Sequence, residues 1–278
     1  MRLSALGELG LLAELERRGL IQGVENDAAE FADGLIVTQD ALVEGVHFRL
    51  DWLSWRDLGW RAAAVNLSDL AASGAEPEVL LVTLGLPAST EVQDVLELYE
   101  GISETGIRIV GGDTTAAAEV VVTVTALGRS ERVPGRGGAR PGDRLGVTGA
   151  LGAAGAAFRK ESYVRPPVRL VEGRRLAAQA HAMLDISDGL AIDVGHLARR
   201  SGVRCVVDLD SVPLAPRAEL QDLSFGEDYE LLVSLDAPSV DVTAIGHVEA
   251  GEGVVFLSGG ESVALAGWEH FGSDHPRV

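Results

Sequence analysis

The chain is poor in positive charge and has almost no lysine. Of its 278 residues, 42 are acidic and 23 are lysine or arginine, so its formal net charge is −19, and Lys160 is the only lysine. Such an acidic surface repels nucleic acid and anionic lipid, and we expect neither as a partner. The chain also lacks both a GxxxxGK[ST] phosphate loop and the strand lysine of protein kinases. Any bound nucleotide must therefore have its phosphates neutralised in another way.

Cysteine and long apolar runs are scarce as well. Cys205 is the only cysteine, so no intrachain disulfide can form, which fits a reducing compartment. The start at Met1 shows no basic segment followed by an apolar one, and no run approaches the roughly 18 apolar residues of a membrane span. We therefore expect a cytoplasmic protein without a membrane partner. Hydrophobic residues make up 46% of the chain, which is enough to fill a core.

Helical and strand patterns alternate along the chain without a strict rhythm. This irregular order favours an α+β fold over a doubly wound sheet. A stretch rich in glycine, proline and arginine, residues 133–143, is expected to join an N-terminal domain (1–132) to a C-terminal domain (133–278). The capping-box pair Thr90 and Gln93 predicts the start of a helix. The patterns predict helices at 4–18, 56–72, 90–105, 167–181 and 188–202, and strands at 35–39, 78–86, 107–110, 120–128, 144–149, 182–187, 203–209, 229–235 and 242–248.

Aspartates recur near the ends of the predicted strands. Taken singly, each has an ordinary explanation: Asp188 can cap a helix, Asp113 can be a turn residue, and Asp69 can face solvent. Taken together, they supply the oxygen ligands that hard divalent cations such as Mg²⁺ prefer. The candidates are Asp27, Asp40, Asp69, Asp113, Asp185 and Asp188.

Repulsion between the negative charges limits how such a cluster can exist. Carboxylates that share one cleft must be partly protonated or bound to cations. Mg²⁺ usually shares its remaining positions with substrate phosphates, so an acidic cleft can bind a polyphosphate through the metal, which replaces the missing lysine. The segment GRGGARPGD adds backbone N–H groups and the guanidinium groups of Arg136 and Arg140, whose forks match phosphate oxygens. A flexible linker remains an alternative for this segment, as an ordinary surface or core position does for His47.

Six segments resemble, in this order, those of the thiamine-monophosphate kinase family: TQDALVEGVHF, NLSDLAASGAEP, GGDTT, GARPGD, LDISDGLAID and GEDYELL. The match runs from about Gly7 to Phe271, and the combination is specific although each piece alone is weak. The resemblance implies a PurM-like fold of two α+β domains, the N-terminal one forming half of a barrel that a homodimer completes. It also implies ATP-dependent phosphorylation of thiamine monophosphate to thiamine diphosphate, with several Mg²⁺ ions and direct in-line transfer without a phosphoenzyme.

The resemblance further implies roles for individual residues. The positions that match ATP contacts are Tyr99, Gly112, Asp113, Arg136 and Ser187. The positions that match the thiamine site are His47, Glu227 and Trp268, and an aromatic face over a cationic thiazolium is physically reasonable. The positions that match the metal site are Asp27, Thr38, Gln39, Asp40, Asp69, Asp113, Asp185 and Asp188. No general base stands out, and attack by an ionised phosphate oxygen needs none.

Three positions depart from the family pattern and leave the aspartates in place. Asn26 stands where an aspartate is usual, Gln39 where threonine is frequent, and Phe225 where glycine is frequent. These changes bear on the number of metal ions and on the shape of the substrate pocket.

Two other classes of function remain alternatives. Relatives in the superfamily make selenophosphate, purine intermediates or a hydrogenase-maturation group. The first of these typically carries a reactive cysteine or selenocysteine near the N-terminus, whereas Cys205 is far downstream. The other alternative is a cation-binding module without catalysis, which would need the aspartates but not the arginine-glycine segment, Tyr99 or Trp268.

Overall fold

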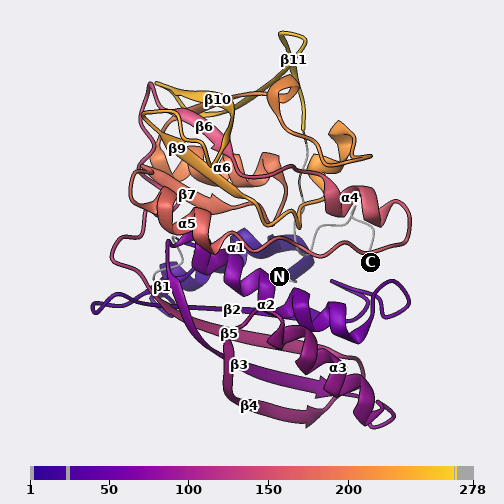
Figure 1. Ribbon diagram of the computed structural model, residues 1–278. Coiled ribbons are helices and arrows are strands. Elements are labelled where there is room, and N and C mark those ends of the chain that lie inside the picture. The colour runs from indigo at the N-terminus through magenta and orange to yellow at the C-terminus, as the bar shows by residue number, and fades with distance from the viewer. Residues whose placement is uncertain (1–2, 23–25, 266, 268–278) are drawn as a thin grey trace.

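The computed structural model describes residues 3–22, 26–265 and 267, and it has two halves, each built on one sheet (Figure 1). The first sheet has the strand order β1-β2-β5-β3-β4, and the second has the order β12-β11-β8-β10-β6-β9-β7. Helices connect strands in both halves, and the second sheet contains both parallel and antiparallel strand pairs. The predicted α+β class is confirmed.

The first half packs two helices against one face of its sheet. Its elements are α1 (Leu3–Arg17), β1 (Ala29–Glu30), β2 (Leu35–Val43), α2 (Trp55–Ala72), β3 (Glu76–Leu86), α3 (Val92–Ser103), β4 (Arg108–Ala116) and β5 (Val121–Arg129). In β5 buried and half-buried residues alternate, as expected for a strand with one face on a core. Helices α2 and α3 approach each other through Gly59 and Gly101, where a Cβ atom would lie only 1.9 Å from a backbone oxygen of the other helix.

The second half surrounds helix α6 with its sheet and loops. Leu184, Leu190, Leu197 and Leu232 are fully buried in its core. Its elements are β6 (Arg144–Val147), α4 (Ala153–Phe158), α5 (Leu170–Ala177), β7 (Ala182–Asp185), α6 (Leu190–Ser201), β8 (Arg204–Asp208), the 3₁₀ turns η1 (Leu209–Ser211) and η2 (Leu220–Ser224), β9 (Leu231–Leu235), β10 (Thr243–Glu249), β11 (Gly253–Ser258) and β12 (Glu261–Val263).

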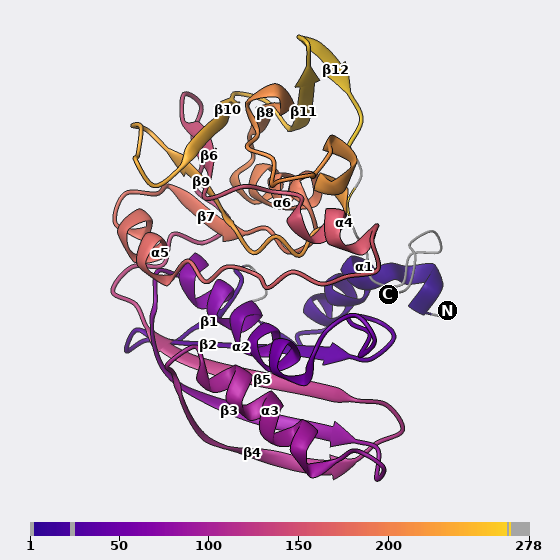
Figure 2. The same ribbon diagram turned by 45° about the vertical axis from the view of Figure 1, so that its right-hand side comes forward.

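Helix α2 lies between the two halves, which both ribbon views show (Figures 1 and 2). It is rich in alanine and buried along most of its length. On the side of the second half it meets α5 at Gly173, where a Cβ atom would lie 2.3 Å from the carbonyl oxygen of Ala71. Trp60 Nε1 also donates to the carbonyl oxygen of Pro166 at 3.1 Å. Residues on α2 can therefore take part in sites formed by both halves.

Several predicted boundaries were wrong. Strand β2 continues to Val43, so Asp40 lies within the strand and not after it. Strand β4 continues through the two glycines that suggested a turn, because at Gly112 the backbone of β3 is so close that a Cβ atom would lie 1.7 Å from the Val82 carbonyl oxygen. The predicted capping box is absent, since Glu91 is the N-cap of α3 and makes no side-chain cap bond. Gly189, and not Asp188, is the N-cap of α6.

Strands β11 and β12 were not predicted, and α5 is shorter than expected. Among the described residues, no helix combines the length and the apolar character that a membrane span requires.

Candidate active site

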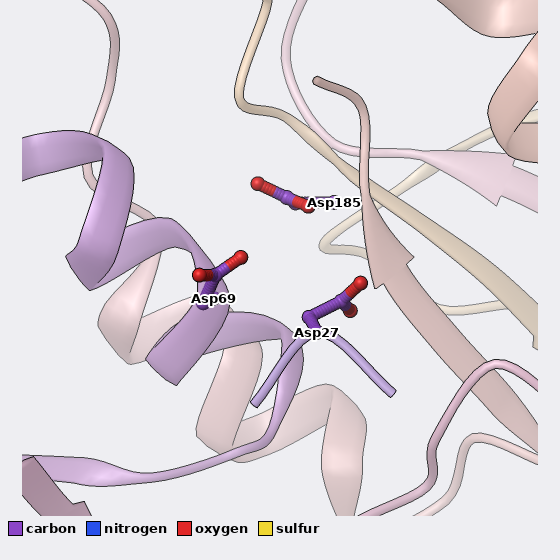
Figure 3. Close-up of side chains that lie close together, drawn as sticks. All are labelled: Asp27, Asp69 and Asp185. Atoms are coloured by element: carbon purple, nitrogen blue, oxygen red, sulfur yellow. The ribbon is translucent and has the colours of Figure 1, made fainter. Parts of the chain in front are cut away.

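Three aspartates from distant parts of the chain meet between the two halves. Asp27 lies in the loop before β1, Asp69 on α2 and Asp185 at the end of β7 (Figure 3). Each offers a carboxylate oxygen, and these three oxygens lie within 4.8 Å of one another. Three carboxylates at this spacing form the kind of oxygen cluster that binds hard divalent cations.

Hydrogen bonds from neighbouring side chains hold the three carboxylates in place. Thr38 Oγ1 donates to Asp69 Oδ2, and Ser68 Oγ donates to Asp185 Oδ2 at 2.6 Å. Nε of Arg136 donates to Asp27 Oδ1 at 2.6 Å. The cluster is thus fixed by residues of β2, of α2 and of the glycine-rich segment between the two halves.

The departure at Asn26 has a structural role in the loop that carries Asp27. Asn26 Oδ1 accepts a hydrogen bond from the backbone N–H of Arg136 at 3.1 Å. The amide also packs on Gly135, where a Cβ atom would lie 2.5 Å from Asn26 Oδ1. Asn26 therefore anchors the glycine-rich segment, and Arg136 of that segment reaches the cluster.

A cavity of about 330 Å³ opens beside the aspartates and is lined by most of the predicted site residues. Because side chains alternate along a strand, Thr38 and Asp40 lie on one face of β2 and Gln39 lies on the other. Gln39 borders the cavity, but its Oε1 accepts a hydrogen bond from Thr125 Oγ1 at 2.8 Å. The cavity is lined by Asp27, Thr38, Asp40, His47, Asp69, Arg136, Ser187, Asp188 and Glu227, among other residues.

Burial and mutual repulsion raise the pKa values of the clustered aspartates. Burial, with the charges of Asp188 and Asp27, raises the pKa of Asp40 to about 6. Burial and the charge of Asp27 raise the pKa of Asp185 to about 8. Burial also raises the pKa of Asp69 well above its ordinary value, with Asp40 as the next cause. Without a cation, burial and mutual repulsion therefore shift these three carboxyl groups toward the protonated form.

Asp193 is a further buried acid that the sequence analysis missed. It lies on α6 with 1% of its surface exposed, and its Oδ2 accepts a hydrogen bond from the backbone N–H of Asp188 at 3.1 Å. Its contact fixes the loop that carries Ser187 and Asp188. A signal existed in the sequence, because Asp193 falls on the apolar side of the predicted helix, where a charged residue is rare.

Three predicted ATP contacts lie away from this cavity within the same chain. Tyr99 packs against the core of the first half. Gly112 and Asp113 lie on β4. Asp113 pairs with Thr83 on β3, Thr83 pairs with Thr123 on β5, and Thr123 pairs with Ala41 on β2. Three strand spacings separate β4 from β2, which is roughly 14 Å. The predicted Trp268 lies outside the described residues.

A short strained loop brings Glu227 to the cavity. Glu227 and Tyr229 have φ angles of 59° and 50°, a left-handed conformation that is costly for residues other than glycine. Backbone bonds hold the loop, from Glu227 N to Ser187 O at 2.8 Å and from Tyr229 N to Ile186 O at 2.9 Å. The Glu227 carboxylate forms an ion pair with Arg61 on α2, a residue only 4% exposed that the sequence analysis did not single out.

Comparison with known proteins places this site in a family. Residues 25–130 match the family described as AIR synthase related protein, N-terminal domain, so the first half belongs to the PurM-like class. A thiamine-monophosphate kinase of Aquifex aeolicus is 34% identical over 98% of this chain and 100% of the relative. One of Pyrococcus horikoshii is 34% identical over 87% of this chain and 88% of the relative. The chain therefore belongs to the thiamine-monophosphate kinase family, as the resemblance predicted.

A solved structure agrees with this assignment. The structure described as AaThiL complexed with AMPPCP and TMP matches with a TM-score of 0.87 and 34% sequence identity. The match covers 97% of this chain and 99% of that chain. The similarity thus extends over both halves and over the interface where the aspartates meet.

Proposed function

We propose that the chain transfers the terminal phosphoryl group of ATP to thiamine monophosphate, yielding thiamine diphosphate and ADP. The observation that carries the proposal is the meeting of Asp27, Asp69 and Asp185 within 4.8 Å, beside a cavity that Arg136 also lines. The family relationship supports the choice of substrates, because relatives carry the name of this kinase and a similar structure was solved with AMPPCP and TMP.

The residues of the cavity fit magnesium. All the grouped donors are carboxylate oxygens, which suit Mg²⁺ better than softer metals that prefer sulfur or imidazole. Asp27, Asp69 and Asp185 would hold the first ion, with Asp40 and Asp188 available at the same cavity. When bound, Mg²⁺ neutralises the phosphate oxygens and stabilises the charge that develops during transfer.

The chain's own residues supply position and charge. Arg136 of the glycine-rich segment bonds Asp27 of the cluster, and we assign its guanidinium group and the Ser187 loop to the phosphates of ATP. His47 and Glu227 line both this cavity and the pocket that adjoins it, and we assign them to thiamine monophosphate. A phosphate monoester is largely ionised near neutral pH, so its oxygen can attack without a protein base.

The first test is turnover of the purified chain. With ATP, Mg²⁺ and thiamine monophosphate, we expect thiamine diphosphate and ADP in equal amounts by chromatography. Removal of Mg²⁺ with a chelator is expected to stop the reaction. Binding of cation and nucleotide without turnover would instead indicate a cation-binding module, and turnover with selenide or a purine precursor would indicate another branch of the superfamily.

A homodimer is part of the same proposal. Helices α2 and α3 cover one face of the first sheet, while the other face includes the exposed side chains of Leu81 and Val110. Strand β4 is also a nine-residue edge strand, and an edge of this length is prone to pair with another chain. Pairing of two copies through this face would cover it and would place β4, which carries Gly112 and Asp113, at the interface.

The oligomeric state tests this part of the proposal. We expect the protein to be a dimer by light scattering and Val110→Asp to shift it toward monomers, because the variant would bury a charge at the interface. Val171→Asp on α5 is the matched control, since both valines are 53% exposed. A monomeric wild type, or a Val110→Asp variant as dimeric as the control, would contradict the proposed pairing.

A further inference from the structure

A second, smaller pocket adjoins the acidic cavity. Its volume is about 30 Å³, enough for one or two water molecules or for one small substituent of a ring. The two spaces share His47, Phe225, Glu227 and Tyr229 in their walls. A ligand in the acidic cavity can therefore extend one group into the smaller pocket.

Several aromatic side chains line the small pocket. Phe158, at the end of α4, lies 4.8 Å from Phe225 between ring centroids and 5.6 Å from Trp52. This row of rings joins the loop after β2 to α4 and to the loop before β9. Apolar walls exclude water, and hydrogen bonds inside the pocket are correspondingly more selective.

Three of the polar side chains that line the pocket are Arg61, Glu227 and Tyr163, and the first two are paired with each other. The guanidinium group of Arg61 bonds the Glu227 carboxylate, and its Cζ atom lies 5.8 Å from the centre of the Tyr163 ring. The hydroxyl oxygen of Tyr163 is buried and has no hydrogen-bond partner among the described residues. Buried hydroxyl groups nearly always have a hydrogen-bond partner in folded proteins. A buried hydroxyl without one, on a residue that lines a pocket, therefore indicates that a ligand supplies the partner.

We propose that the Tyr163 hydroxyl and the Glu227 carboxylate together bind an exocyclic amino group on a heteroaromatic ring, which makes Tyr163 a specificity-determining residue. An amino group has two N–H donors, and the two oxygens provide one acceptor for each. The pocket has room for the amino group, while the ring lies at the shared opening beside Phe225. The inference rests on the proposed function, because the aminopyrimidine of thiamine monophosphate carries such a group.

Arg61 supports this arrangement without needing to contact the ligand. Burial raises the pKa of Glu227, and the positive charge and hydrogen bond of Arg61 oppose that rise, which favours the ionised carboxylate that accepts a hydrogen bond. The bond also fixes the rotamer of Glu227 relative to α2. Arg61 is thus a positioning residue in the same pocket.

The test is Tyr163→Phe, which removes the hydroxyl oxygen and keeps the ring. We expect the KM for thiamine monophosphate to rise about five- to tenfold, with kcat and the KM for ATP within about twofold of wild type. Because the hydroxyl has no partner in the free protein, the thermal midpoint should stay equal or rise. Wild type should also discriminate against an analogue in which an oxo group replaces the amino group, and the variant should discriminate less.

The control is Ser162→Ala, the neighbouring position. Its hydroxyl already bonds the carbonyl oxygen of Ala157 at 3.1 Å, so its removal should leave the KM for thiamine monophosphate unchanged. An unchanged KM in Tyr163→Phe, or a lower thermal midpoint with a parallel fall in kcat, would overturn the inference and make Tyr163 a structural residue.

Calorimetric titration with thiamine monophosphate in the absence of ATP separates this inference from the proposed reaction. Binding that weakens in Tyr163→Phe supports the pocket even if wild type shows no turnover, and in that case only the reaction is wrong. If wild type turns over and the variant binds thiamine monophosphate with the same affinity as wild type, the proposed reaction is supported and the proposed role of the pocket is wrong. If wild type neither binds nor reacts, both are wrong.

Discussion

Asp40→Asn is expected to lower kcat by about 100-fold or more while the fold survives. Asp40 lies at the cavity within electrostatic range of Asp27 and Asp188, and asparagine keeps its size but removes its negative charge. The backbone bond from Asp40 N to Asn66 Oδ1, at 3.0 Å, does not involve the altered side chain. Initial rates at saturating ATP, thiamine monophosphate and Mg²⁺ measure the effect, and circular dichroism checks the fold.

Asp33→Asn is the matched control for this loss of charge. Asp33 is an exposed aspartate whose side chain pairs with Arg129 at the surface. The same chemical change there should leave the rate unchanged, because the site lies outside the cavity and exposed ion pairs contribute little. A rate for Asp40→Asn equal to that of the control would remove Asp40 from the proposed metal site.

Asp185→Asn is expected to have two opposite effects, abolishing turnover and stabilising the metal-free protein. The folded-state pKa of Asp185 is raised by burial and by Asp27 from 3.8 to about 8. Such a group contributes stability below about pH 4, and this stability is lost as the pH rises through 8. The neutral amide avoids that loss, and its oxygen can still accept the bond from Ser68 Oγ. We expect a thermal midpoint at least about 2 °C above that of wild type at pH 9.

Scanning calorimetry with a chelator at pH 5, 7 and 9 measures this effect. The difference between variant and wild type should grow with pH, and added Mg²⁺ should stabilise wild type more than the variant. A midpoint for Asp185→Asn below that of wild type at pH 9 would contradict the prediction.

Asp143→Asn provides a control of the opposite sign. Burial would raise the pKa of Asp143, but hydrogen bonds from Ser234 and His181 outweigh it and lower the pKa. The charged form of this buried aspartate therefore stabilises the fold above pH 4, and that contribution is lost as the pH falls through its lowered pKa. Asparagine at this position should lower the thermal midpoint at pH 7 and 9.

The sequence predicted the class of fold and most elements because their periodicities are strong. The alanine-rich pattern of α2 and the apolar runs of β3 and β5 match the structure closely. Strand β4 was cut short because glycine is rare in strands, and only its close approach to β3 explains Gly112 there. No local pattern can report an approach between two separate strands.

The gathering of the aspartates followed from charge and ligand chemistry, but their detailed neighbours did not. The alternation of β2 would have set Gln39 apart from Thr38 and Asp40 if the strand had been extended beyond residue 39. Arg61 and Glu227 are 166 positions apart in the chain, and their ion pair depends on the packing of α2 against the second half. Tyr163 becomes notable only once its hydroxyl is seen to be buried and unpaired.

Helix α2 carries Arg61 at one end of the substrate region and Asp69 at the other. Eight residues of α-helix span about 12 Å along the axis. Because a helix packed on several sides resists stretching, that interval would keep the proposed ring-binding end and the proposed phosphate-binding end at a fixed distance. On this proposal the site would select ligands by length as well as by chemistry, and a compound with a shorter or longer tether between ring and phosphate would contact only one of the two ends.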